Sequence, residues 1–513
     1  MDANGALIRA GKSSQKTSLS QVALKAALDR SDTSPKTGLR DLPVELVQDI
    51  IRGVAASGSA GDTAVGLRAI MLSNKFLKGA VLGEQSVEEH YEFLQPLIGA
   101  FNALKPHLAI HQVNSQMLAL MGPKQRRGQV TAALGLADGG WNKAQAIVRL
   151  GAGLMTLERS QQQALVTAAL GLPEMMKATA IAVLGSGLGA LERSQQQALV
   201  TAALNLANEG NKTKAIAGLG AGLAHLSESQ REELVTAVLD LARGLHKAHA
   251  IAGLGAGLTA LERPQRQVLI TAALGLAGGW DKAKAIAGLG AGLRALERSQ
   301  QQALVMAALN LANEGYKARA IAGLGAGLAA LEGPLQEKLV MAALGLADER
   351  GKALAIAGLG AGLVALERSQ QQALVTAALN LADEGEKARV IAGLGAGLAV
   401  LERSQQQALV TAALGLTDEW GKAEAIAGLS AGLGALERPQ QEALVTAALG
   451  LTIEGDKAEA IAELGAGLTA LERPQQQALV LAALGLADER HKAQAIAGLV
   501  NGYQASRVRD YLR

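Results

Sequence analysis

The sequence predicts an all-α protein, an αα-solenoid of about eleven 35-residue two-helix repeats preceded by a small helical domain. Three observations support this fold class. One unit of about 35 residues recurs along residues 121–505, each unit carries two apolar stripes with helical spacing, and the core must be aliphatic because the 513 residues include only three Trp, four Tyr and three Phe. A fixed period of this size is typical of solenoids and other repeat arrays. The repeats start at residues 121, 157, 191, 226, 261, 296, 331, 366, 401, 436 and 471.

The first helix of a repeat is well marked in the unit 366–400. Ser369 and Gln372 form an S-x-x-Q pattern, which predicts a capping box at the helix start. Leu374, Ala378 and Leu381 follow at i, i+4 and i+7 and form an apolar stripe. Some copies have a proline beside the capping position, which the first turn of a helix tolerates; these are Pro264, Pro439 and Pro474.

The second helix is predicted to begin near Lys387, after a charged, glycine-containing turn. Its apolar stripe is longer than that of the first helix and consists of Ile391, Leu394, Leu398 and Leu401. Neither helix can bury its stripe alone, so neighbouring repeats must stack. The longest apolar run of a repeat, 353–366, is too short to span a bilayer and fits a buried helix.

Glycines interrupt the second helix at Gly393, Gly395 and Gly397. Each interior glycine costs about 1 kcal/mol relative to alanine, so a gain must offset it in every repeat. We expect that gain to be the close approach of a neighbouring helix backbone. A phosphate-binding loop is the less favoured alternative, since the glycines follow no strand and lie inside a helical pattern.

Charge and composition exclude several kinds of chemistry. The net charge is only +3, which argues against a nucleic-acid partner, and the chain has no cysteine, which excludes disulfides, cysteine-based zinc sites and thioester chemistry. The histidine pairs His107/His111 and His246/His249 lack an evident third ligand. We therefore expect no metal, no cofactor and no enzymatic activity. No signal peptide and no membrane-spanning segment is recognised.

The turn between the two helices varies most from repeat to repeat. It holds all three tryptophans, and aromatic residues on an aliphatic frame are candidate hot spots for a protein partner. Alternatively, each ring simply folds over the neighbouring helix ends. A second variable position follows the "AGL" string. The target-binding candidates from the two positions are Trp141, Trp280, Tyr316, Trp420 and Arg294.

Residues 39–83 contain a second motif, "LPVEL" followed by an amphipathic helical stripe. This segment resembles an F-box. The resemblance implies that the segment docks onto the Skp-type adaptor of an SCF ubiquitin ligase, while the solenoid holds the target protein. A helical cap for the first repeat would look similar and is the alternative. The matching residues are Leu42, Pro43, Glu45, Leu46, Ile50 and Ile51.

The repeats themselves resemble the HEAT/armadillo class, although they are shorter than usual. They lack the aromatic positions of tetratricopeptide repeats and bear only a faint similarity to TAL-type DNA-binding repeats. The remaining segments are predicted to be a disordered leader rich in Ser, Thr and Lys, a divergent helical cap and a polar C-terminal cap; these are residues 1–38, 84–120 and 506–513.

The combination of leader, F-box and duplicated repeats is similar to type III effectors of plant-pathogenic bacteria. That resemblance implies a secretion signal in the leader and a site of action in the host cytoplasm or nucleus; without it, a cytoplasmic location is expected. The predicted function is therefore an F-box-type substrate adaptor without catalysis. The alternatives are a plain protein-interaction scaffold with no ubiquitin link and, less favoured, a nucleic-acid-binding array.

Overall fold

The computed structural model describes residues 93, 96–101, 103–104, 115–136 and 141–512, with side chains described up to Tyr503. These residues form helices joined by short turns, and no strand occurs among them. The all-α solenoid predicted from the sequence is confirmed. The predicted leader and the F-box-like segment 39–83 lie outside the described residues, as does most of the predicted cap 84–120.

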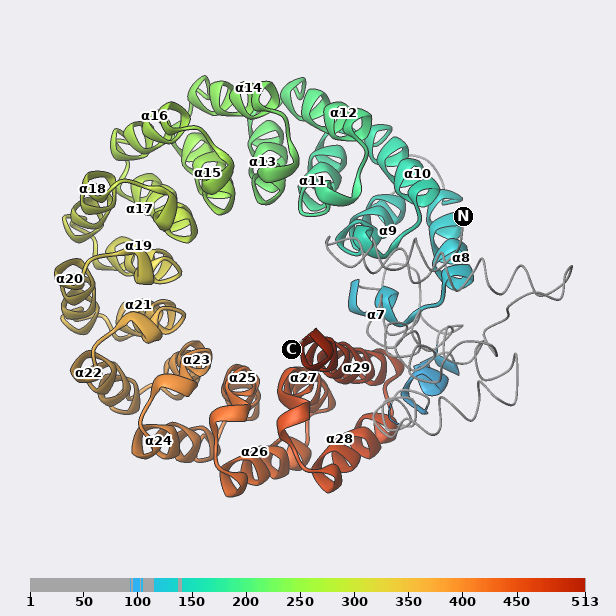
Figure 1. Cartoon of the computed structure of the whole chain (residues 1–513), viewed down its shortest axis with the longest axis vertical. Coiled ribbons are helices and arrows are strands. Elements are labelled where there is room, and N and C mark those ends of the chain that lie inside the picture. Colours follow the sequence, from blue (N-terminus) through green and yellow to red (C-terminus); the bar gives the residue numbers. More distant parts are fainter. Residues whose placement is uncertain (1–92, 94–95, 102, 105–114, 137–140, 513) are drawn as a thin grey trace, which may run out of the picture.

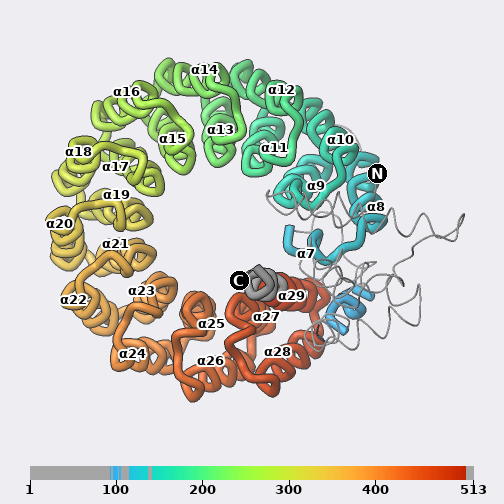
Figure 2. The backbone as a smooth tube through the Cα atoms, in the orientation of Figure 1, coloured from blue at the N-terminus to red at the C-terminus, as the bar shows by residue number. Residues whose placement is uncertain are grey.

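Helices alternate between two layers, and Figures 1 and 2 show the layers as concentric rings. The first helix of each repeat lies outside: α8 Pro123–Leu134, α10 Arg159–Leu170, α12 Arg193–Leu204, α14 Glu228–Leu239, α16 Arg263–Leu274, α18 Arg298–Leu309, α20 Gly333–Leu344, α22 Arg368–Leu379, α24 Arg403–Leu414, α26 Arg438–Gly450 and α28 Arg473–Gly485.

The second helix of each repeat lies inside: α9 Trp141–Ala152, α11 Glu174–Gly185, α13 Glu209–Leu219, α15 Gly244–Leu254, α17 Gly279–Leu289, α19 Glu314–Gly325, α21 Glu349–Gly360, α23 Glu384–Gly395, α25 Glu419–Ser430, α27 Glu454–Leu464 and α29 Glu489–Leu512. Short 3-10 turns lead back to the outer layer: η6 Leu154–Thr156, η7 Leu188–Ala190, η8 Gly220–His225, η9 Gly255–Ala260, η10 Gly290–Ala295, η11 Leu328–Ala330, η12 Leu363–Ala365, η13 Leu398–Val400, η14 Leu433–Ala435 and η15 Gly465–Ala470.

The two ends of the array meet, so the solenoid closes into a ring (Figure 1). The last helix, α29, lies beside α7 (Ser115–Leu120), and the side-chain amide of Asn501 donates to the Gln116 carbonyl oxygen at 3.0 Å. The ring of Tyr503 lies 4.0 Å from that of Phe93, centroid to centroid, and Tyr503 is buried. We call these contacts the seam.

The outer helices begin two residues earlier than the capping pattern predicted. In the type unit the cap is Glu367, whose backbone N–H donates to the Gln370 side-chain oxygen at 3.1 Å. The Ser369–Gln372 capping box is therefore wrong, because the chain stays extended only as far as Glu367 and both other residues already lie inside the helix. The prolines that replace Ser369 in other repeats do lie in the first helical turn.

The inner helix of the same unit begins at Glu384 rather than near Lys387. The Asp383 carboxylate accepts the backbone N–H of Glu386 at 2.8 Å and caps the helix there. The predicted continuous stripe is also wrong, since α23 ends at Gly395 and Leu398 belongs to the following 3-10 turn. The stripe residues are nevertheless buried, because the turn folds back over the same core.

The glycines of the inner layer lie against neighbouring backbones, as the sequence predicted. A Cβ atom on Gly393 would lie 2.6 Å from the Cα of Ala357 in the preceding repeat, and one on Gly397 would lie 2.6 Å from the Cβ of Leu363. Gly395 faces the other way, against the Gly428 carbonyl oxygen of the next repeat. Gly395 and Gly397 are buried in these contacts, which is inconsistent with a phosphate-binding loop.

Glutamine side chains connect the outer layer. Gln371 is buried and donates to the carbonyl oxygens of Leu363 and Leu366, both at 3.0 Å. Gln372, the next residue, contacts the neighbouring repeat, where the Gln405 amide donates to the Gln372 side-chain oxygen at 2.7 Å.

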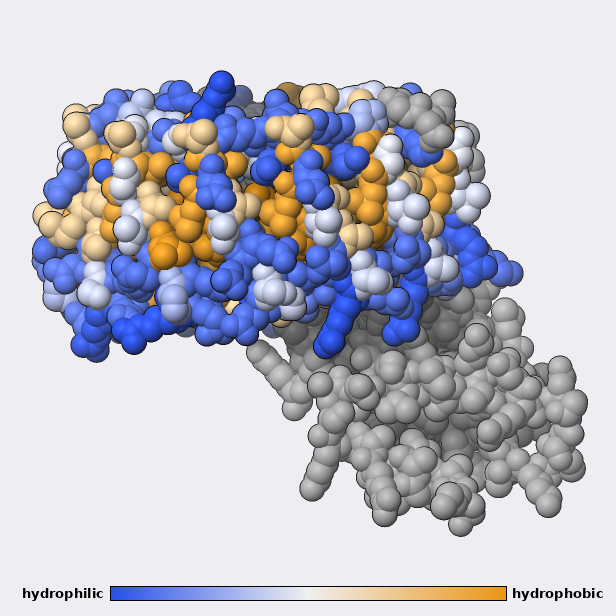
Figure 3. All heavy atoms as spheres, turned by 90° about the horizontal axis from the view of Figure 1, so that it is seen from above, coloured by the Kyte–Doolittle hydropathy of each residue, from blue (hydrophilic) through white to orange (hydrophobic). Residues whose placement is uncertain are grey.

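Seen from the side in Figure 3, apolar residues form a belt across the wall of the ring and hydrophilic residues gather along its two edges.

Among the described residues, no helix combines the length and apolar character needed to cross a membrane.

Candidate protein-binding surfaces

The inner surface of the ring is lined by one residue per repeat that points away from the core. In α23 this residue is Arg389, which lies two positions from the fully buried Ile391 and so almost opposite to it on a helix that turns 100° per residue. We call the equivalent positions the inner column. They are Gln145, Thr179, Lys214, His249, Lys284, Arg319, Leu354, Arg389, Glu424, Glu459 and Gln494.

Charges in the inner column are sorted along the ring. Basic residues occupy it from Lys214 to Arg389, interrupted by Leu354, and acidic residues follow at Glu424 and Glu459. Glu463 adds a further carboxylate one helical turn after Glu459. Sequence reasoning missed this sorting, although the signal was present as a position of the second helix that varies strongly from repeat to repeat.

Contacts tie the column residues to their neighbours. The Lys214 ammonium group donates to the Thr179 hydroxyl of the preceding repeat at 2.8 Å. The Arg319 guanidinium carbon lies 4.3 Å from the centre of the Trp280 ring, which is a cation–π arrangement. Arg389 forms an ion pair with Glu386 on its own helix at 2.5 Å. The Lys214–Thr179 bond shows that column residues of successive repeats can reach one another.

Burial and like charges shift the pKa values of the column residues. Burial lowers the pKa of His249, and the nearby Lys284 and His246 lower it further, although Asp281 raises it. Burial raises the pKa of Glu424, with Glu459 and Glu386 adding to the rise and Arg389 opposing it. The buried Oε2 atom of Glu424 has no hydrogen-bond partner among the described residues. The acidic section is thus short of positive partners.

The aromatic candidates lie at the start of the inner helices, along the edge formed by the turns within each repeat. Trp141 and Trp420 are 58% and 52% exposed and lie on different parts of the ring. Trp280 and Tyr316 do come together, with ring centres 5.9 Å apart in an edge-on arrangement. Arg294 is exposed in η10, at the opposite end of the inner helices.

A ladder of glutamates, also missed from the sequence, connects the same edge. The Glu384 carboxylate accepts the backbone N–H groups of Thr417 and Asp418 of the next repeat at 2.8 and 3.3 Å, and the Thr417 hydroxyl at 2.8 Å. These hydrogen bonds, the hydroxyl first, lower the pKa of Glu384. Equivalent bonds start from Glu174, Glu209, Glu314, Glu349, Glu419 and Glu454.

The ladder is interrupted where glycine replaces glutamate at the start of the inner helix. This happens at Gly244 and Gly279. The Trp280–Tyr316 contact bridges one of these two junctions. The aromatic cluster therefore stands where the glutamate bonds are missing, so Trp280 has a local packing role that the exposed Trp141 and Trp420 lack.

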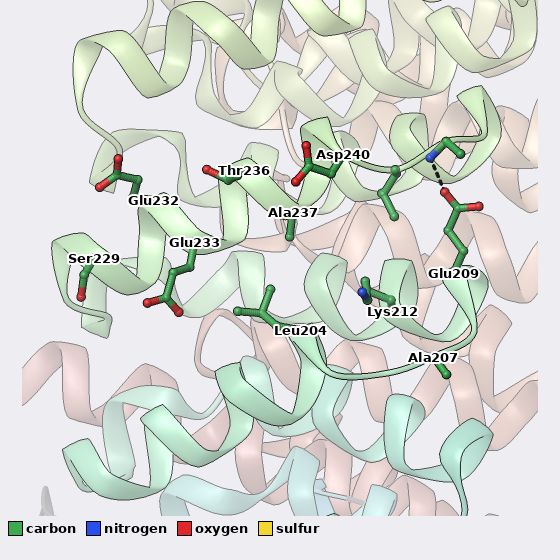
Figure 4. Close-up of a pocket in the computed structure, with 12 residues that line it drawn as sticks. Leu204, Ala207, Glu209, Lys212, Ser229, Glu232, Glu233, Thr236, Ala237 and Asp240 are labelled. Carbon is green, nitrogen blue, oxygen red and sulfur yellow. Dashed lines mark hydrogen bonds between the residues drawn. The ribbon is translucent and has the colours of Figure 1, made fainter.

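A groove of about 670 Å³ lies between α12 and α14. Its polar lining includes Glu232 and Glu233 on α14, Asp240 directly after α14 and Lys212 on α13, as Figure 4 shows. Glu209 borders the groove but accepts the backbone N–H of Arg243 at 3.2 Å, and its Oε2 atom lies 3.0 Å from His246 Nδ1. The groove presents separated carboxylates rather than an assembled catalytic pair.

No metal site is found in the part of the chain that the structure describes, where no three His, Asp or Glu residues cluster suitably. His246 is engaged by Glu209, and His249 points into the inner column. The other histidine pair, His107 and His111, lies outside the described residues.

No family model matches the sequence, and no curated protein matches it. Three solved structures of the karyopherin Kap121p are similar in fold. They are a multiple mutant (11% identity, TM-score 0.41), the complex with Ste12p (11%, 0.42) and the complex with the SUMO protease Ulp1p (13%, 0.35). The matches cover 92%, 92% and 97% of this chain, which spans 59%, 59% and 64% of the respective Kap121p chains.

Proposed function

We propose that this chain is a non-catalytic protein-binding scaffold that holds a protein ligand on the inner surface and turn edge of its ring. The observation that carries the proposal is where the repeats differ. Buried positions repeat almost unchanged, whereas the inner column and the turn edge change identity from repeat to repeat. Such a division suits the recognition of a particular ligand. The buried residues then determine the stability of the fold, and the variable surface residues determine which ligand binds.

The experiment that tests this proposal is selection of binders from a peptide-display library on the purified full chain. We expect enrichment of a defined set of sequences whose affinity can be measured by fluorescence anisotropy. Replacing the exposed rings with Trp141→Ala and Trp420→Ala should weaken the ligands that reach the turn edge by about 30-fold, or about 2 kcal/mol for a hot spot.

The matched control removes exposed apolar side chains from the outer wall, where no ligand is expected. Met341→Ala with Leu481→Ala serves this purpose, since these residues are 64% and 70% exposed on α20 and α28. Binding should stay within about twofold, as for surface residues outside an interface. Absence of any enriched sequence, or an equal loss in both double variants, would contradict the proposal.

The finer hypothesis is that the scaffold is an F-box-type adaptor delivering its ligand to an SCF ubiquitin ligase. Its support is the sequence resemblance of residues 39–83, led by Leu42 and Pro43. The test is association of the full chain with a plant Skp-type adaptor, compared with Leu42→Ala plus Pro43→Ala, with circular dichroism as the control for folding. If the wild type binds the Skp-type adaptor and the folded variant does not, the F-box hypothesis is supported. If the wild type binds none of several Skp-type adaptors, only the scaffold proposal remains.

The type III effector hypothesis, with secretion into a plant cell, rests on the same resemblance and is tested by fusing the leader 1–38 to a reporter in a strain with a working secretion system. Nucleic-acid binding predicts affinity that falls steeply with salt. A salt titration without any binding removes that alternative.

A further inference from the structure

We infer that the inner column is a track for an extended polypeptide segment whose acidic residues face the stretch from Lys214 to Arg389. This inference rests on the scaffold proposal and deepens it by naming the chemistry of the ligand. It is carried by the sorting of charge around the inner surface. The permanent cations lie in one part of the column, with His249 and Leu354 between them, and the carboxylates Glu424 and Glu459 follow.

The basic section keeps an excess of positive charge that the ring itself does not neutralise. It holds four permanent cations, namely Lys214, Lys284, Arg319 and Arg389. The acidic residues that face this section are Asp281, near His249 and Lys284, and Glu386, paired with Arg389. Among the described residues the Lys214 ammonium group bonds to the Thr179 hydroxyl, and neither Lys214 nor Lys284 forms an ion pair, so both remain available to a ligand.

Spacing along the track matches an extended chain. Closely packed helices lie about 8–10 Å apart, and a β-strand rises about 3.3 Å per residue, so consecutive inner helices correspond to about three residues of extended ligand. The glycine contacts between inner helices favour the short end of that range. An acidic residue at about every third position would therefore meet a permanent cation at four of the six inner helices from α13 to α23.

The reversal of sign decides between a polypeptide and a nucleic acid. A polyanion that follows the column from Lys214 would meet Glu424, Glu459 and Glu463, where like charges repel it. Nucleic acid also needs denser positive charge than one residue per repeat. A polypeptide can change sign at the same place, where a basic residue would face the carboxylates of the acidic section.

The test uses a labelled synthetic peptide made of Asp-Ser-Gly triplets followed by two Arg-Ser-Gly triplets. Its length provides about three residues for each inner helix from α13 to α27. Binding to the full chain is measured by fluorescence anisotropy at physiological salt. Two comparison probes carry the same charge: a peptide of identical composition with its aspartates contiguous, and a single-stranded oligothymidylate. We expect the triplet peptide to bind about tenfold more tightly than either, equivalent to 1.4 kcal/mol.

A matched pair of variants locates the binding site. Lys214→Gln with Lys284→Gln removes two charges from the column, and Arg263→Gln with Arg298→Gln removes two exposed charges from the outer layer, where the side chains are 75% and 87% exposed. We expect the column variant to lose about tenfold in affinity and the outer variant less than about twofold. Circular dichroism and thermal unfolding confirm that both variants are folded.

A further variant tests whether the arginine end of the peptide lies on the acidic section of the column. Glu424→Gln should weaken the peptide with arginine triplets and leave unchanged a peptide in which serines replace the arginines. Equal loss in the column and outer variants, or preference for the contiguous peptide or the oligonucleotide, would overturn the inference. If the triplet peptide fails while display-selected ligands bind through Trp141 and Trp420, the track is wrong and the scaffold stands. If no ligand binds at all, both are wrong.

Discussion

The two layers of the ring are held together by opposite means. In the inner layer, glycines such as Gly395 bring the helix of one repeat against the backbone of the next. In the outer layer, the spacers are long side chains, with Gln405 reaching Gln372 at 2.7 Å and Arg403 pairing with Glu437 at 3.0 Å. Because the inner spacing is short and the outer spacing is long, every junction bends the stack in the same direction.

The comparison explains how a repeated sequence produces a closed ring without any special junction. Small residues set the inner radius and long polar residues set the outer one, so the curvature accumulates with repeat number. The ends then meet at the seam, where Asn501 bonds to Gln116. Four predictions separate the layers, the seam and the edge from one another, beginning with the largest effect.

Removing a glycine contact from the inner layer should have the largest effect on stability. In Gly395→Ala the new Cβ atom would collide with the Gly428 carbonyl oxygen, which is backbone and cannot move aside alone. We expect a loss of about 3 kcal/mol, the order seen for strong overpacking, measured by urea unfolding.

The control for this prediction is Gly128→Ala in the outer helix α8, where nothing lies within 4 Å of the new Cβ atom and the residue is exposed. This substitution should stabilise the chain by up to about 1 kcal/mol, because alanine favours a helix over glycine. Equal effects at the two glycines would show that inner contacts do not set the spacing.

Opening the seam should change shape more than secondary structure. Tyr503→Ala removes a buried ring whose centre lies 4.0 Å from that of Phe93 and should cost the seam about 3 kcal/mol, as for other buried aromatic residues. Small-angle X-ray scattering should then show a larger radius of gyration while circular dichroism is unchanged, since each repeat contacts only its neighbours. An unchanged radius would mean that the repeats alone maintain the ring.

Glutamine substitutions in the outer layer should have a smaller effect, and two adjacent residues provide the comparison. Gln371→Ala leaves the carbonyl oxygens of Leu363 and Leu366 without the buried amide that serves both, at a cost of about 2 kcal/mol. Gln372→Ala removes an exposed hydrogen bond to Thr376 and a part-buried one from Gln405, and it should cost about 1 kcal/mol. Urea unfolding of the two variants side by side checks the difference.

The periodicity of the sequence was enough to predict the fold class, the two helices of each repeat and the role of the glycines. Those features depend on local patterns, such as the stripe of Ile391 and Leu394 or the cost of Gly393 inside a helix. The exact helix starts were wrong because the chain stays extended only as far as the caps Glu367 and Asp383, so the two helices begin before the predicted positions at Ser369 and Lys387.

Ring closure, the glutamate ladder and the inner column were not predicted, for a common physical reason. Each depends on relations between repeats rather than within one. Glu384 and Thr417 are 33 residues apart, and Asn501 and Gln116 are separated by 385. The charge sorting becomes visible only when one position is aligned across every repeat and its direction relative to Ile391 is known. The residues of the F-box-like segment stay a prediction.

The smallest predicted effect compares carboxylates at the edge and on the inner surface. Hydrogen bonds lower the pKa of Glu384, mainly from Thr417, and that of Glu419, mainly from the Ile453 backbone N–H. A lowered folded pKa contributes stability above the ordinary value of 4.5 and loses it as the pH falls through the folded pKa. Glu384→Gln with Glu419→Gln should therefore lower the unfolding temperature at pH 7 and have less effect in acid.

Glu424 should behave in the opposite way, because burial raises its pKa above the ordinary value of 4.5 and its ionised form is the disfavoured one. Its charge costs stability at pH 7 and nothing once the pH is below 4.5, so Glu424→Gln should raise the unfolding temperature at pH 7 and leave it unchanged in acid. Thermal unfolding from pH 7 down to about pH 3 gives both slopes. A destabilised Glu424→Gln variant at pH 7 would mean that the ionised carboxylate is stabilised by a partner within the ring, contrary to the raised pKa.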